Sequence, residues 1–183
     1  DGLAAGVSTI AGVTLFMIAF ERGQDLSAIM ALALVGATLG FLRYNFNPAR
    51  IFMGDCGSLF LGFMLGALSI TGAMKVAATV SVFLPILILG IPIFDTAFAI
   101  IRRLITRKPI FQADKGHLHH RLLRVGLSQR KAALMIYGFS ALFGGGGLYL
   151  IHFPHARVLI VVSLMLIIWG AVDFRIFRPR RMN

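Results

Sequence analysis

The chain has 183 residues, of which 58% are hydrophobic and 14% charged, and it carries a formal net charge of +11. Soluble domains average about 45–50% apolar and about 25% charged residues. A water-soluble protein this apolar would expose large hydrophobic patches. The composition therefore excludes an ordinary soluble domain and indicates an integral membrane protein.

Six segments without Asp, Glu, Lys or Arg follow one another along the chain. They are residues 3–20, 26–42, 56–74, 76–94, 132–151 and 158–172. A helix needs about 20 apolar residues to cross the hydrocarbon, with about 17 as the lower limit, which the sixth segment reaches only with its flanking residues. We predict an all-α fold, a polytopic integral membrane protein with about six transmembrane helices, in which residues 1–183 form a single transmembrane domain.

The first segment, residues 3–20, lacks the basic region and the cleavage site of a signal peptide. The fourth contains Pro85 and Pro92, and a proline cannot continue a regular hydrogen-bond ladder. We expect residues 93–106 to bend away and to lie near the cytoplasmic interface. In the fifth, the glycines of "FGGGGLYL" (143–150) permit close helix packing.

Six spans alternate, so the loops divide between two sides of the membrane. Residue 1, the loop 43–55, the segment 102–131 and the tail after 174 share one side, which holds fifteen of the 18 Lys and Arg residues. This imbalance orients that side to the cytoplasm, so residues 107–130 form a cytoplasmic histidine-rich and basic loop. The charge suits anionic lipid or an anionic substrate. We expect no nucleic acid partner, because no separate soluble domain could carry such a site.

The stretch "IFMGDCGSLF" (51–60) places Asp55 at the cytoplasmic start of the third span. As a helix cap, its carboxylate would accept from the amides of Gly57 or Ser58. Gly54 and Gly57 favour a second interpretation, because glycines let the backbone approach a ligand and a helix N-terminus favours phosphate. A carboxylate there also suits Mg²⁺. The stretch alone leaves both interpretations open.

Asp95 follows Pro92 at membrane depth, where a charged residue costs roughly 2.5–3.5 kcal/mol and usually faces a cavity or a partner. Pairing with Arg102 or Arg103 is the structural alternative to a role in a site. The sequence does not decide between them.

The stretch "ADKGHLHHRLL" (113–123) gathers many hydrogen-bond donors, which are Lys115, His117, His119, His120 and Arg121. Zinc is disfavoured, because zinc ligands usually have wider spacing and include Cys or acidic residues. Imidazole, ammonium and guanidinium groups together suit a clamp on phosphate. A solvated basic loop touching lipid headgroups is the alternative. Asp1 and the loop with Asn47 and Arg50 share this face, and together the residues describe a site that handles phosphate.

Three stretches carry a resemblance to a known family: "FNPARIFMGDCGSLFLGF", "GIPIFDTAFAIIRRL" and "ADKGHLHHRLLRVGLSQRKA". They closely resemble bacterial polyprenyl-phosphate N-acetylhexosamine-1-phosphate transferases, of the glycosyltransferase family 4 type. The nearest branch looks like the undecaprenyl-phosphate N-acetylglucosamine-1-phosphate transferases that start teichoic acid and O-antigen assembly. The similarity covers nearly the whole chain, and "FMGDxGS" together with "HLHHRLL" is highly specific.

The resemblance implies a reaction in which undecaprenyl phosphate attacks UDP-N-acetylglucosamine and UMP leaves, with Mg²⁺ required and Mn²⁺ as a possible substitute. It implies that Asp55 is the catalytic metal ligand, that the three histidines contact the diphosphate, and that Asp1 lies near the nucleotide. Lys115, Arg121, Asn47, Arg50, Gly54 and Asp95 complete the expected substrate-binding set. It further implies a bacterial cell (inner) membrane protein with its active site on the cytoplasmic face, for which a homodimer is one possible arrangement.

The chain departs from the family pattern in two ways. Cys56 stands where threonine is common, and the family's adjacent aspartate pair and first spans are absent. We therefore expect the chain to be the C-terminal part of such an enzyme and to be inactive alone. Two alternatives remain: the phospho-N-acetylmuramoyl-pentapeptide transferases, which carry consecutive histidines in place of "HLHH", and a transporter or channel subunit, which would spread polar residues through its spans.

Overall fold

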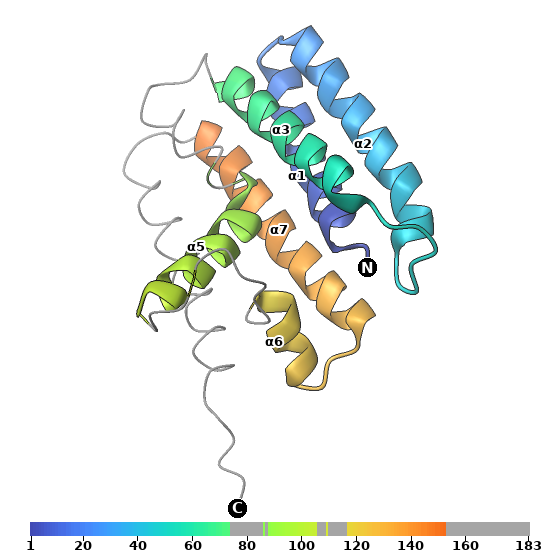
Figure 1. Cartoon of the computed structure of the whole chain (residues 1–183). Coiled ribbons are helices and arrows are strands. Elements are labelled where there is room, and N and C mark those ends of the chain that lie inside the picture. Colours follow the sequence, from blue (N-terminus) through green and yellow to red (C-terminus); the bar gives the residue numbers. More distant parts are fainter. Residues whose placement is uncertain (74–85, 87, 106–108, 110–116, 153–183) are drawn as a thin grey trace, which may run out of the picture.

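The computed structural model describes residues 1–73, 86, 88–105, 109 and 117–152. These residues form the helices α1 (Leu3–Glu21), α2 (Asp25–Asn45), α3 (Gly54–Ala73), α5 (Gly90–Ile105), α6 (Leu118–Arg124) and α7 (Gln129–His152). Figure 1 shows α1, α2, α3 and α7 running side by side, with α5 crossing α7 and the short α6 at one end.

Four helices are long and apolar enough to cross a membrane, and they are α1, α2, α3 and α7. They coincide with the predicted spans 3–20, 26–42, 56–74 and 132–151, so the predicted all-α polytopic membrane fold is confirmed. Most of the predicted span 76–94 and all of 158–172 lie outside the described residues.

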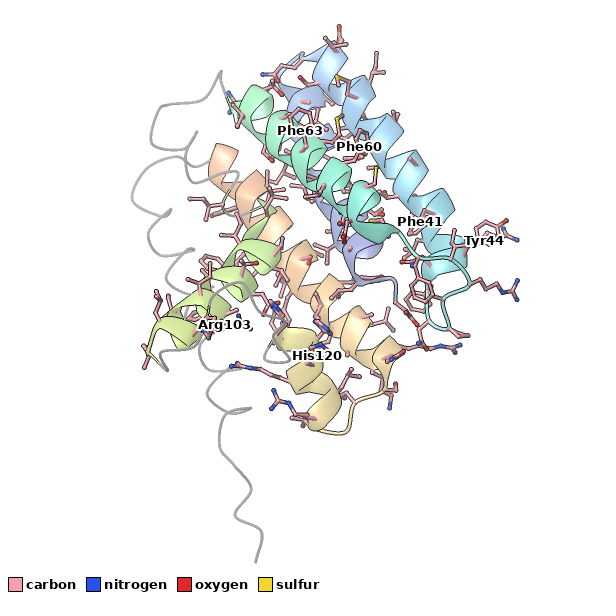
Figure 2. All side chains as sticks on the ribbon, viewed as in Figure 1. Phe41, Tyr44, Phe60, Phe63, Arg103 and His120 are labelled. Carbon is pink, nitrogen blue, oxygen red and sulfur yellow. The ribbon has the colours of Figure 1, made fainter. Side chains whose placement is uncertain are left out.

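Helix α1 is the centre of the bundle, in contact with α2, α3 and α7. Within its apolar stretch 61% of the residues are buried, against 39% for α7 and 28% for α2. A helix that is apolar on every side is expected to be surrounded by other helices. The outer faces of α2 and α3 are exposed and apolar, as at Ile29 and Leu32, and Figure 2 shows Phe60 and Phe63 on α3. These faces suit contact with lipid.

Small residues let α7 approach α1 closely. A Cβ added at Gly6 would lie 2.0 Å from the Tyr137 ring, and one added at Gly144 would lie 2.4 Å from Thr14 Oγ1. Gly144 thus confirms the close packing predicted for the glycine patch, whereas Gly145 faces open space. In membranes, where apolar area drives little association between helices, such contacts and interhelical hydrogen bonds hold the bundle together.

Helix α5 begins at Gly90, so Pro92 lies in its first turn, where a missing N–H is tolerated. The helix crosses α7. It runs as one helix from Gly90 to Ile105, so the bend predicted at residue 93 is not seen within it, and most of the span before it lies outside the described residues. Its polar Arg103 is buried, while Leu104 and Ile105 are exposed. An apolar outer surface suits lipid, and the placement of α5 near the cytoplasmic interface stays a prediction.

Replacing Gly6 with alanine should destabilise the bundle. The new methyl group would displace the Tyr137 ring and break the hydrogen bond that Tyr137 Oη donates to Gly2 O at 2.7 Å. Overpacking of this kind costs about 1–3 kcal/mol of unfolding free energy. Equilibrium unfolding of the parent protein and of Gly6→Ala in mixed micelles measures this loss of unfolding free energy.

Gly36→Ala is the matched control, because a Cβ at Gly36 meets nothing within 4 Å. It should leave the unfolding free energy unchanged or raise it by up to about 1 kcal/mol. Equal effects of the two substitutions would contradict the close contact between α1 and α7.

Candidate active site

The described residues predicted to share one face gather at one end of the bundle, while the tail after 174 lies outside the described residues. Figure 1 shows the N-terminus, the connection from α2 to α3, α6 and the first turn of α7 at that end, with the turn between α1 and α2 at the other. The alternation of spans along the sequence therefore predicted the clustering correctly. That this end faces the cytoplasm stays a prediction.

Asp1 and Asn47 form a hydrogen-bonded group with the start of α7. Asn47 Nδ2 donates to Asp1 Oδ2 at 3.1 Å and also contacts Gln129 Oε1. Arg130 Nε donates to Asn47 O at 2.9 Å. The structure thus brings Asp1 and Asn47 together, whereas the side chain of Arg50 is exposed and makes no described hydrogen bond within this group.

Sequence reasoning missed Asn45, which holds this corner in place. Its Oδ1 accepts from Gly2 N at 3.0 Å, and its Nδ2 donates to Ile51 O at 2.8 Å. Asn45 is buried at the end of α2. The only signal was an amide residue at the end of a long apolar run.

Asp55 lies in the first turn of α3, directly after Gly54. Gly54 has a left-handed φ of +66°, which glycine adopts without strain. Asp55 is exposed, and no hydrogen bond to its carboxylate is found within the described residues, so the capping interpretation gains no support. A Cβ at Gly57 would lie 2.5 Å from Met53, so this second glycine makes room for a side chain.

Asp95 joins α5 to α6. Its Oδ2 lies 3.0 Å from His117 Nδ1, and its Oδ1 accepts from Leu118 N at 2.8 Å. Among the described side chains its hydrogen-bond partner is His117, while Arg103 donates to Pro109 O at 2.6 Å. The side chain of Arg102 lies outside the described residues.

The three histidines form a contiguous group of rings around α6. The His117 and His119 rings are stacked with centroids 6.2 Å apart, and those of His119 and His120 are 4.0 Å apart. Burial lowers the pKa of His119 below its usual 6.5, and the neighbouring His120 lowers it further, while Asp95 opposes the shift. At neutral pH His119 is therefore an uncharged imidazole with one donor and one acceptor nitrogen.

A cavity of about 1180 Å³ opens beside these groups, between α1, α3, α5, α6 and α7. Most of its lining is apolar, including Val7, Leu61, Leu65 and Ile136. The polar side chains in the lining are Ser8, Ser58, Asp95, Thr96, His117 and His119. The Asp95–His117 bond and the stacked rings concentrate the ionisable groups at one place in a mostly apolar wall.

The donors present fit a magnesium ion shared with substrate phosphates. Asp55 offers an exposed carboxylate without a described partner, and Mg²⁺ usually takes one or two protein carboxylates together with phosphates and water. No three His, Cys, Asp or Glu side chains converge on one point within the described residues. A cage built from protein ligands alone therefore does not fit the described part of the chain.

Of the predicted site residues, only Asp95, His117 and His119 line the cavity. The other described ones do not line it, and they are Asp1, Asn47, Arg50, Gly54, Asp55, His120 and Arg121. Arg121 is buried in α6 with 8% of its surface exposed and interacts within the protein. Lys115 and the greater part of 107–116 lie outside the described residues. Substrate contacts by all of the predicted site residues stay predictions.

Comparison with known proteins gives relatives over most of the chain. A probable undecaprenyl-phosphate N-acetylglucosaminyl 1-phosphate transferase of Bacillus subtilis is 50% identical over 143 residues, which are 78% of this chain and 40% of that protein. A decaprenyl-phosphate N-acetylglucosaminephosphotransferase of Mycolicibacterium smegmatis is 36% identical over 92% of this chain and 46% of its own length.

A phospho-N-acetylmuramoyl-pentapeptide-transferase of Moorella thermoacetica is 34% identical over 82% of this chain and 46% of its own length. The chain thus spans less than half the length of these three relatives. Residues 1–73 match the family described as glycosyl transferase family 4. With this match and these relatives, the chain belongs to glycosyl transferase family 4.

Proposed function

We propose that this chain carries part of the active site of an enzyme that transfers N-acetylglucosamine-1-phosphate from UDP-N-acetylglucosamine to undecaprenyl phosphate. UMP is the second product, and the reaction initiates a cell-envelope glycopolymer. The observation that carries the proposal is the apolar cavity with the Asp95–His117 pair in its wall. The 50% identity to a B. subtilis protein of that name supports it.

The cavity suits a substrate that is part hydrocarbon and part phosphate. Its apolar lining can take a polyprenyl chain, while the imidazoles can meet phosphate oxygens. The outward apolar surface of α5 would let such a chain reach the cavity from the bilayer. We place the site at the cytoplasmic face of a bacterial cell membrane, on the strength of the basic residues at this end.

In the proposed reaction an oxygen of the lipid phosphate attacks the sugar-bearing phosphorus. The new P–O bond forms as the bond to the UMP oxygen breaks, and the electron pair leaves with UMP. Phosphoryl transfer depends chiefly on positioning and on neutralising spread charge. The histidines would hold phosphate oxygens, and Asp1 and Asn47 would lie near the nucleotide. Asp55 would hold Mg²⁺, which supplies positive charge when bound.

The alternative substrate is that of the phospho-N-acetylmuramoyl-pentapeptide transferases. Relatives of that name are 33–34% identical to this chain, against 50% for the N-acetylglucosaminyl relative. The ionisable lining residues Asp95, His117 and His119 lie together at one place, which disfavours a transporter pathway.

The test uses the complete gene product in lipid nanodiscs with undecaprenyl phosphate and Mg²⁺. Release of UMP from UDP-N-acetylglucosamine, with formation of the diphosphate-linked lipid, is the expected result. Release only from UDP-N-acetylmuramoyl-pentapeptide would favour the alternative enzyme, and release from neither would overturn the proposal.

Asp55→Asn should lower kcat by about 100-fold or more, because a neutral amide is a poor ligand for a hard cation. The thermal unfolding of the protein should be unchanged, since no described hydrogen bond depends on the carboxylate. Asp25→Asn is the control, because Asp25 is also exposed in a first helical turn but lies at the other end of the bundle. Near-normal turnover of Asp55→Asn at limiting Mg²⁺ would contradict the metal role.

Binding of UDP-N-acetylglucosamine should tighten as the pH falls from about 7 toward 6. The free protein holds the pKa of His119 below 6.5, and a bound diphosphate would raise it, so binding takes up a proton. This gain in affinity is absent well above pH 7, where His119 stays neutral in both the free and the bound protein. Isothermal titration in buffers of different ionisation enthalpy counts the protons.

His119→Gln should flatten this pH dependence and weaken nucleotide-sugar binding more than lipid binding. Asp95, His117 and His120 also face His119, so their single variants must be titrated in parallel. An unchanged proton uptake in His119→Gln would remove His119 from the phosphate contact.

A further inference from the structure

The Asp95 carboxylate uses both of its oxygens on the histidine segment. Oδ1 accepts from the backbone amide of Leu118 at 2.8 Å, and Oδ2 lies 3.0 Å from His117 Nδ1. These two bonds link α5 to the start of α6. Their partners are 22 and 23 residues from Asp95 in the chain. Both side chains are only partly exposed, at 23% for Asp95 and 33% for His117, and both line the cavity.

The bond to Leu118 fixes which oxygen is left for His117. Because the Leu118 amide donates to Oδ1, the carboxylate is oriented with Oδ2 toward the imidazole. An ionised carboxylate has no hydrogen, so Oδ2 can only accept. His117 Nδ1 must therefore carry a hydrogen to make this bond. In an imidazole, the bond that one nitrogen makes decides the state of the other.

We propose that Asp95 is a positioning residue that fixes the tautomer and orientation of His117, so that Nδ1 bears the proton and Nε2 meets a phosphate oxygen in the cavity. Near neutral pH a phosphate monoester exists with and without its last proton. A protonated oxygen donates to Nε2, and an ionised one accepts from Nε2 once the ring is protonated. In either case one proton lies between Nε2 and the phosphate oxygen. In the second case the ring is cationic, and the negative Asp95 stabilises it.

A purely structural role for Asp95 would be to cap α6 through Leu118 N. Asp95→Asn separates the two roles, because asparagine can still accept from Leu118 with Oδ1. Its Nδ2, however, donates to His117 Nδ1, which must then give up its hydrogen and leave it on Nε2. The cap survives and the tautomer is reversed.

The first measurement reads the tautomer directly. Nitrogen chemical shifts of ¹⁵N-histidine-labelled complete protein in nanodiscs, with His117 assigned through His117→Gln, should show the Nδ1–H form. The Asp95→Asn protein should show the Nε2–H form, with the thermal unfolding temperature unchanged. His152 and His155 serve as internal references, because they lie outside the 117–120 segment.

The second measurement is a double-mutant cycle on UMP release, and it rests on the proposed function. Partners that orient metal-bound histidines typically contribute about 10–100-fold, and we expect the lower end of that range here, so Asp95→Asn should lower kcat/KM by about tenfold in the parent protein. In a His117→Ala background the same change should cost less than about twofold, because Asp95 acts through His117. Asp95→Ala, which removes the cap as well, should lower the unfolding temperature too.

The outcomes distinguish the two proposals. An unchanged His117 tautomer in Asp95→Asn, or an equal loss of kcat/KM with and without His117, would overturn the positioning role. A parent protein that shows the expected tautomers but releases no UMP would overturn the proposed function and leave the local inference standing.

Discussion

The contact between Gly6 of α1 and Tyr137 of α7 is the constraint on which the arrangement of this chain depends. The absence of a side chain at Gly6 lets the aromatic ring lie against the backbone of α1, and its hydroxyl donates to Gly2 O. Gly2 in turn donates to Asn45. One close approach therefore orders the first residues of the chain, the end of α2 and the middle of α7.

The cavity depends on the same packing. Leu118 and Leu122 of α6 pack in one cluster with Val7, Ile91, Ala132, Ile136 and Phe143, so the histidine segment is seated on α1, α5 and α7 together. With Leu118 and Leu122 packed in this cluster, His117 Nδ1 and the backbone amide of Leu118 face Asp95. The histidine segment is thus held by the apolar contacts of Leu118 and Leu122 and by two hydrogen bonds to the Asp95 carboxylate.

Much of this could be predicted from the sequence. The number of apolar residues that a helix needs to cross the hydrocarbon predicted the four described spans. The alternation of these spans predicted that Asp1, Asn47 and the histidines lie at one end of the bundle. The partner of Asp95 could not be predicted, because arginines at helical spacing competed with a histidine 22 residues away. The role of Asn45 could not be predicted either, because its side chain bonds to the backbone groups of Gly2 and Ile51, which come together only in the folded protein.

The Tyr137–Gly2 hydrogen bond also sets an order in time. Its partners are 135 residues apart, and ribosomes add about 5–20 residues per second. The first residues of α1 therefore wait about 7–27 seconds for the ring that covers Gly6. Throughout that interval the Gly6 face of α1 has no Tyr137 ring to cover it, and the corner with Asp1 and Asn47 has no α7 to bind. The site becomes complete only when one of the later helices arrives.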